Sequence, residues 1–262
     1  MDITSIPGIM RRMTPRPWGN GARLMEIWFS RAPNSVPENG APETSTIRMD
    51  SWALTFSRFA QVYRRMVSQR PWCSEESKRR IGRLLRAQRV LGARQRVSFG
   101  NLNRPVPQLN LEYCCEESVG SIADPLDDMY GALGRFTLRA VVAGTVTPLS
   151  LPAQVQVPVR VPGATMSGSA RPSGAISQYS VEIEQVGFYI FDSYDFNGLQ
   201  PLGFWSHSGF SPVPMVGYDF VENATFREWR NQHQHGGDYY VFSDLKVIRR
   251  NPPDSFVLPS HL

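Results

Sequence analysis

The alternation of apolar and polar positions changes its period about half-way along the chain. In the N-terminal half, apolar residues recur every three or four positions, which is typical of one helix face. Residues 22–30 place Leu24, Met25, Trp28 and Phe29 together in this way. The pattern therefore predicts a short helix there, between a Pro- and Gly-containing lead-in and a polar, Pro-rich loop over residues 31–47.

The longest apolar stripe begins after Asp50 and Ser51, either of which is a suitable N-cap. Its members follow at helical spacing: Trp52, Phe56, Phe59, Tyr63 and Met66. Helix-on-helix core is the expected role of this stripe, and a groove for a partner or a lipid is the alternative. Pro71 ends the pattern.

A second helix is expected to start at Ser74, with Glu75 and Glu76 in the first turn, where the helix dipole favours anions. Ile81, Leu84 and Leu85 form its inner face, and Gly92 is the expected stop.

Beyond residue 130 the period falls to two, which predicts strands. The candidate strands are residues 136–142, 155–161 (with Pro158, an edge signal), 179–191 (one strand or a strand pair) and 239–247. Residues 162–175 and 198–219 read as loops. Residues 223–232 read as a short helix capped by Asn223, with Phe226 and Trp229 inward.

These elements predict an α+β fold, with a helical N-terminal half followed by an antiparallel β-rich half, either a twisted sheet or a partly open barrel. The expected regions are 1–98 (helical and arginine-rich), 99–125 (connector), 126–250 (β-rich, carrying the candidate site) and 251–262 (tail).

Charge is distributed unevenly over the 262 residues. Residues 1–100 hold 18 Lys+Arg and 7 Asp+Glu, or +11, whereas residues 101–262 hold 10 and 16, or −6. Solvated helix faces are the ordinary explanation of such a bias. An acidic partner, phosphate or RNA are the alternatives, with nucleic acid the least favoured.

Cysteine spacing and hydropathy exclude several classes of protein. Cys73, Cys114 and Cys115 form no CxxC pair, which argues against a disulfide scaffold or a zinc finger and favours a reducing compartment. A bridge from Cys73 to Cys114 or Cys115 after export stays open. No apolar run approaches the roughly 20 residues that span a bilayer. Residues 1–17 lack the apolar core of a signal peptide, so we expect synthesis in the cytoplasm without one.

The first candidate site follows the apolar strand that ends at Phe191. Asp192, Tyr194, Asp195 and Asn197 supply two carboxylates, a phenol and an amide. Asp192 and Asp195 are the candidate ligands of a hard cation such as Mg²⁺, which prefers oxygen and polarises phosphoryl groups. The alternative is a turn, because Asp and Asn cap turns and Asn197-Gly198 is a strong turn signal.

The second candidate site is the pair His233 and His235, followed by two glycines and Asp238. Histidines at this spacing can bind a metal or act as a general base. A helix C-terminus with a glycine stop is the alternative. His207 is a third candidate histidine.

Several sequence blocks along most of the chain resemble a bacterial family catalogued as domain of unknown function 6402. The matching blocks are residues 6–13 (IPGIMRRM), 28–29 (WF), 49–52 (MDSW), 133–136 (LGRF), 186–189 (VGFY) running into DSYDFNG, 202–205 (LGFW), 223–230 (NATFREWR) and 236–245 (GGDYYVFSDL). The resemblance implies genes beside type VI secretion spike and PAAR genes, and hence a secreted effector or its accessory, delivered into a target cell.

A shorter resemblance concerns mechanism. Residues 192–197 are similar to the D-x-Y-D-x-[ND] signature of colicin M-type toxins, which cleave a lipid-linked pyrophosphate with Mg²⁺. The resemblance implies a metal-dependent hydrolase. The family's following His-Arg pair is replaced here by Pro201-Leu202. One of the three candidate histidines, with Arg227 or Arg230, would have to take its place in space.

Two functional hypotheses follow. The first is an antibacterial type VI effector, acting on a lipid-linked precursor and paired with an immunity protein. The second is a non-enzymatic adaptor that binds a spike, a PAAR protein or a neighbouring toxin through the basic half of the chain.

Overall fold

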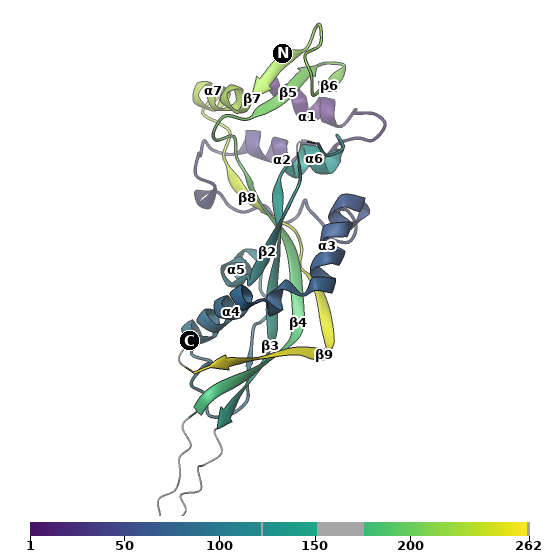
Figure 1. Cartoon of the computed structure of the whole chain (residues 1–262). Coiled ribbons are helices and arrows are strands. Elements are labelled where there is room, and N and C mark those ends of the chain that lie inside the picture. The colour runs from purple at the N-terminus through teal and green to yellow at the C-terminus, as the bar shows by residue number, and fades with distance from the viewer. Residues whose placement is uncertain (122, 151–175, 261–262) are drawn as a thin grey trace, which may run out of the picture. The chain divides into compact units, whose positions relative to one another are not determined.

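The computed structural model describes residues 1–121, 123–150 and 176–260. It is a mixed α+β protein, with helices mostly in the N-terminal part and antiparallel sheets in the C-terminal part, as the sequence predicts (Figure 1). The helices are α1 (Ile6–Met10), α2 (Gly19–Ser30), α3 (Ser57–Gln69), α4 (Glu75–Ala87), α5 (Val106–Leu109), α6 (Asp128–Leu133) and α7 (Asn223–His233). The strands are β1 (Val97–Phe99), β2 (Cys115–Val119), β3 (Phe136–Ser150), β4 (Ile176–Tyr194), β5 (Pro201–Ser206), β6 (Gly209–Ser211), β7 (Asp219–Glu222), β8 (Tyr239–Phe242) and β9 (Lys246–Pro259).

The chain divides into two compact units, each assembled from three segments. The first unit comprises Met1–Pro71, Asn103–Val141 and Gly187–Val247. The second comprises Trp72–Leu102, Val142–Val186 and Ile248–Leu262. The long strands β3 and β4 contribute residues to both units.

In the first unit, β2 pairs antiparallel with the start of β3, and β8 pairs antiparallel with the end of β4. A separate three-stranded sheet has the order β6-β5-β7. Helices α1, α2 and α6 pack together, with α2 in contact with both others (Figure 1). The core includes Trp28, Phe188, Tyr189, Phe226 and Tyr239, all fully buried.

In the second unit, β1 pairs antiparallel with residues 144–146 of β3. Ile81 and Leu85 of α4 are buried with Trp72, whose indole Nε1 donates to Asp254 at 3.0 Å. Arg250 lies 2.9 Å from the same carboxylate. Helix α4 begins where the sequence predicts, and Ser74 is its N-cap, because the Ser74 hydroxyl accepts from the backbone N–H of Ser77.

Several predicted element boundaries are wrong. The long N-terminal helix does not begin at Asp50 or Ser51: residues 53–55 form a single 3-10 turn, and α3 starts at Ser57. Within its stripe, Phe59 and Met66 are core, as expected, while Trp52, Phe56 and Tyr63 are half-buried. Helix α4 ends at Ala87, because the left-handed conformation falls at Arg89 (φ 58°) before Gly92 is reached.

Other differences concern segments read as irregular. The predicted connector over 99–125 contains α5 and β2, and the predicted loop over 198–219 contains β5 and β6. The last predicted strand is broken by residues 243–245, and β9 continues through most of the predicted tail. Short strands without clean alternation carry no strong period, so the sequence pattern misses them. The predicted strand at 155–161 and the loop at 162–175 lie outside the described residues.

None of the helices in the described ranges is long and apolar enough to cross a membrane.

Candidate functional site

The first motif forms the end of β4 and the turn that follows it. The carboxylate of Asp195 accepts two hydrogen bonds inside this turn: Oδ2 from the Ser193 hydroxyl at 2.7 Å and Oδ1 from the Asn197 backbone N–H at 3.0 Å. This is the side-chain-to-backbone pattern of an Asx turn. Asp195 therefore stabilises the turn by these two hydrogen bonds.

The aromatic residues of the motif belong to the core. Tyr194 is 8% exposed and stacks on Tyr239 at 5.3 Å between ring centroids. Burial raises the pKa of the Tyr194 phenol far above its ordinary value, with the nearby Asp192 contributing in the same direction. Phe196 stacks face to face on Phe226 of α7 at 3.8 Å. The motif is thus anchored on α7 by apolar packing.

Helix α7 also holds the turn through polar contacts. Arg227 Nη1 donates to the carbonyl oxygens of Phe196 and Gly198, each at 2.7 Å. Asn223 Nδ2 donates to the carbonyl of Asn197 at 2.6 Å. The helix begins with a capping box in which Glu222, rather than the predicted Asn223, is the N-cap and Thr225 its partner. Asn223 is therefore free to bind the motif loop.

Arg230 lies one turn further along α7. It forms a buried ion pair with Asp238, the residue before β8. Arg230 is 6% exposed and Asp238 is fully buried. Arg230 Nη2 lies 3.1 Å from Asp238 Oδ1, which also accepts from the indole Nε1 of Trp28 at 2.8 Å. Burial raises the pKa of the Asp238 carboxyl group above its usual value, and the contacts with Trp28 and Arg230 offset only part of this increase. A pair of this kind is costly to break, because either partner alone is a desolvated charge.

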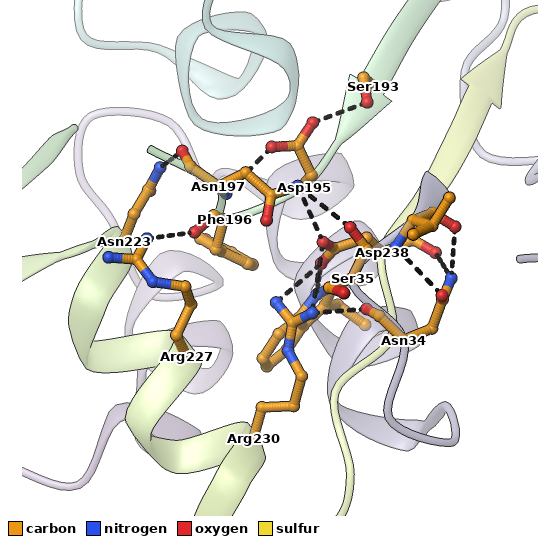
Figure 2. Close-up of polar contacts among 12 residues, drawn as sticks. Asn34, Ser35, Ser193, Asp195, Phe196, Asn197, Asn223, Arg227, Arg230 and Asp238 are labelled. Carbon is orange, nitrogen blue, oxygen red and sulfur yellow. Dashed lines mark hydrogen bonds and ion pairs between the residues drawn. The ribbon is translucent and has the colours of Figure 1, made fainter. Parts of the chain in front are cut away.

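Two asparagines complete what we call the Asp238 cluster: Trp28, Asn34, Asn197, Arg230 and Asp238 (Figure 2). Asn197 Nδ2 lies 3.3 Å from Asp238 Oδ2, and Arg230 Nη1 donates to the Asn34 carbonyl at 2.5 Å. Asn34 Nδ2 in turn donates to the Asp238 carbonyl at 2.9 Å. The cluster thereby joins the motif turn, α7, β8 and the loop after α2.

A cavity of about 530 Å³ adjoins this cluster, lined in part by Arg31, Asn39 and Asp238. The Arg31 guanidinium lies 3.8 Å above the Tyr239 ring and donates to the Ala41 carbonyl at 2.6 Å. The charged groups on the wall of the cavity are thus engaged in contacts within the protein.

Asp192 differs from the rest of the motif. Side chains alternate along a strand, so Asp192 lies on the opposite face of β4 from Ser193, the partner of Asp195. It is directly opposite the buried Val241 of β8. Part of the residue is exposed, yet burial of the carboxyl group raises its pKa well above the usual range. It borders a cavity of about 240 Å³ that Arg135 and Thr137 also line.

The three candidate histidines do not join the motif. His207, His233 and His235 are all exposed. His233 lies in the last turn of α7, where its Nδ1 is 3.0 Å from the Trp229 carbonyl and its ring stacks on Trp229 at 4.6 Å. The helix then ends at Gln234 in the left-handed conformation. The helix C-terminus interpretation therefore describes His233, but the left-handed stop is Gln234 and not the predicted glycine pair.

The residues at the motif do not fit the Mg²⁺ that the colicin M resemblance implies. Both carboxylate oxygens of Asp195 accept hydrogen bonds, and Asp192 lies on the other face of β4. Among the residues that the structure describes, no group of three or more His, Cys, Asp or Glu is arranged to hold a metal ion.

The sequence placed Trp28 on an apolar helix face and Asp238 after the two histidines, but it did not bring either residue together with Asn34 in one cluster. One signal was available: Arg230 follows Phe226 by four residues, so an inward Phe226 places Arg230 on the same buried face. A buried arginine requires a buried carboxylate. Gly236 is a second signal, because only glycine is suited to this position beside the cluster. Its φ is 95°, and a side chain here would collide with the Trp28 ring.

The chain was compared with protein-family models, with curated proteins and with solved structures. No curated protein and no solved structure matches it. The model of a family of unknown function (DUF6402) matches residues 1–219 and 212–258, nearly the whole chain. The chain therefore belongs to the DUF6402 family.

Proposed function

We propose that the protein is a non-enzymatic adaptor that docks onto an acidic surface of a type VI secretion spike or PAAR protein. The resemblance of the chain to a family associated with these genes supplies the context. The single observation that carries the proposal is that the polar residues at the motif form contacts within the protein. Four of the groups expected to perform chemistry, Asp195, Asn197, Arg227 and Arg230, are engaged in contacts that hold the turn, α7 and β8 together.

The surface that supports docking is the exposed face of α4 in the second unit. Arg79, Arg83 and Arg86 follow one another at i, i+4 and i+7, which places them on one side of the helix. All three are exposed, whereas Ile81 and Leu85 on the opposite side are buried. We call these three arginines the α4 basic face. Arg89, just after the helix, is exposed as well.

The charge on this face is largely uncompensated. Among the described residues no ion pair engages Arg83 or Arg89. Within the described part of the chain, Arg86 donates to the Ser260 carbonyl alone, at 3.2 Å, and Arg79 lies near Glu75, which also pairs with Lys78. Arginine suits contacts with carboxylates because its planar fork donates two parallel hydrogen bonds. An acidic protein surface is therefore the partner that we propose.

Capture experiments test this proposal. Spike and PAAR proteins encoded beside the gene are incubated with the immobilised chain, with the double variant Arg79→Glu/Arg83→Glu and with the control Arg12→Glu/Arg16→Glu, which reverses two exposed arginines of the first unit. We expect the wild type and the control to capture a spike or PAAR protein and the α4 variant to lose it. Failure of the wild type to capture any of them, or equal capture by the α4 variant, would contradict the proposal.

A second candidate function, the toxic effector, rests on Asp192. This carboxyl group borders a cavity and carries a raised pKa, which is a feature of catalytic acids. Expression of the chain in a bacterium, with and without a Sec signal, is the test. Growth inhibition that Asp192→Asn abolishes would favour the effector over the adaptor. Normal growth in both compartments is what the adaptor proposal predicts.

A further inference from the structure

Cys114 and Cys115 lie where the chain enters β2. A single 3-10 turn over Asn110–Glu112 precedes them, and β2 begins at Cys115. Successive side chains in a strand point to opposite faces, which would separate the sulfurs of adjacent cysteines. Here the Sγ atoms of Cys114 and Cys115 are only 3.9 Å apart, because Cys114 precedes the regular strand. Neither cysteine is engaged in a disulfide.

The segment that carries this pair is held on both sides. The Cys114 backbone N–H donates to the Ala140 carbonyl at 2.8 Å, and Cys115 is paired with Ala140 in the strand register. Arg139 reaches both flanks, donating to Glu116 at 2.7 Å and to Asn110 at 2.7 Å. The proximity of the two sulfurs is therefore built into the fold and does not depend on a loose loop.

The two thiols differ in access. Cys114 is 3% exposed, and its Sγ lies 3.4 Å from the Ala140 carbonyl. Cys115 is half-buried and retains contact with solvent. An oxidant from solution therefore meets Cys115 first, with Cys114 as the neighbouring thiol.

We propose that Cys114 and Cys115 form an oxidation site that closes a vicinal disulfide when the protein meets hydrogen peroxide. The Cys115 thiolate attacks one peroxide oxygen, the O–O bond breaks, and with one proton taken up Cys115 becomes a sulfenic acid and one water leaves. The Cys114 sulfur then attacks the sulfenic sulfur, the S–O bond breaks, and the thiol proton leaves with the hydroxyl as a second water. Two thiols are oxidised and one peroxide is reduced.

The disulfide is expected to be strained and easily reduced. Consecutive Cα atoms are about 3.8 Å apart, below the roughly 4.4–6.8 Å that unstrained disulfides prefer. Strain favours reduction, which is characteristic of regulatory disulfides. Closing the ring must also bend the chain at the Cys114–Ala140 hydrogen bond, so the attachment of β2 to β3 responds to oxidation.

Peptide mapping of the full chain is the test. Trypsin places Cys114 and Cys115 in one peptide, residues 97–135, because the bond after Arg104 precedes a proline, and it places Cys73 in another. After peroxide at pH 8 and alkylation, we expect peptide 97–135 without alkyl groups and lighter by two hydrogen atoms. Two alkyl groups on this peptide, or a disulfide that joins it to the Cys73 peptide, would overturn the proposal.

Single variants separate the role of Cys115, which is oxidised first, from that of Cys114, which closes the disulfide. In Cys114→Ser, the Cys115 sulfenic acid lacks its neighbour and is captured by a 1,3-dione, whereas Cys115→Ser leaves Cys114 unlabelled. The Cys73→Ser variant still forms the disulfide and serves as the matched control. In the oxidised wild type, hydrogen exchange at the Cys114 amide rises at least tenfold and returns to its starting rate after a dithiol reductant. Equal dione labelling of both single variants, or unchanged exchange, would contradict these roles.

Discussion

Helices α4 and α7 use the same residue type in opposite ways. In α7, Arg227 and Arg230 point into the first unit, where they bind backbone carbonyls and the carboxylate of Asp238. In α4, Arg79 and Arg83 point to solvent. The difference follows from helical phase: Arg230 shares a face with the buried Phe226, whereas Arg79 and Arg83 lie opposite Ile81 and Leu85.

The comparison teaches that residue type alone does not identify a functional arginine. An arginine on the apolar face must find a buried acceptor, and its loss leaves that acceptor unpaired. An arginine on the outer face has its charge available to a partner. The arginines of α7 thus have a structural role, and our proposal gives the α4 basic face a binding role.

The largest loss in the free energy of unfolding is expected from Asp238→Asn. This change leaves Arg230 buried without a counter-charge, which typically costs about 3–5 kcal/mol of the free energy of unfolding. Urea unfolding measures the loss. The matched control is Asp50→Asn, which removes an exposed partner of Lys246 and should cost less than about 1 kcal/mol. Equal losses in the two variants would refute the structural importance of the α7 pair.

The pH dependence of Asp192→Asn is the next effect in size. Because the folded state raises the pKa of Asp192, it binds the proton more tightly than the unfolded state. The wild type is therefore stabilised at low pH and loses that stability as the pH rises through the folded pKa. The asparagine variant does not titrate, so its stability relative to the wild type should increase with pH, by about 1.4 kcal/mol per unit of the pKa shift.

Urea unfolding of both proteins at pH 4 and pH 8 measures this double difference. A relative stability that is the same at both pH values would show that the Asp192 carboxyl group is solvated in the folded protein.

Asn197→Ala should cost about 1 kcal/mol. The variant removes the amide that lies 3.3 Å from Asp238 and 3.4 Å from the Ser35 carbonyl, both long hydrogen bonds. Its control is Asn231→Ala on the exposed side of α7, which should change stability by less than about 0.5 kcal/mol. A larger effect at Asn231 than at Asn197 would show that the motif does not anchor α7.

The smallest effect on stability is expected at the α4 basic face. Arg79→Glu/Arg83→Glu changes two exposed side chains, and surface substitutions of this kind usually stay within about 0.5 kcal/mol each. Thermal unfolding followed by circular dichroism checks this. A loss comparable to that of Asp238→Asn would mean that these arginines support the fold.

The sequence predicts the parts of the fold that have a strong period or a cap. Helix α4, its start after Ser74 and the start of β3 follow directly from the pattern. The start of α3 is wrong because its apolar spacing continues through residues 53–55, where the backbone forms a separate 3-10 turn. Strands β5 to β7 are missed because aromatic, Gly and Pro residues interrupt the alternation.

At the candidate site, the sequence indicated contacts between adjacent residues but not contacts between residues far apart in the chain. The turn at Asp195–Asn197 is encoded by adjacent residues, so the sequence suggested it as one of two interpretations. The Asp238 cluster joins residues up to 210 positions apart, such as Trp28 and Asp238, and a single sequence does not encode that proximity. The same limit applies to the three histidines, which are conspicuous in the sequence but are exposed and, among the described residues, form no hydrogen bond to the motif.

The most direct test of the account is the affinity of the chain for a captured spike or PAAR protein, measured for the wild type, Arg79→Glu/Arg83→Glu and Arg12→Glu/Arg16→Glu. Placing like charges against an acidic surface costs several kcal/mol, so the Kd of the α4 variant should rise by about 100-fold or more. The control should bind within about threefold of the wild type, since rim and distant surface charges contribute less than about 1 kcal/mol. An α4 variant that binds as tightly as the wild type would contradict the central claim that the outward arginines of α4 are the docking surface.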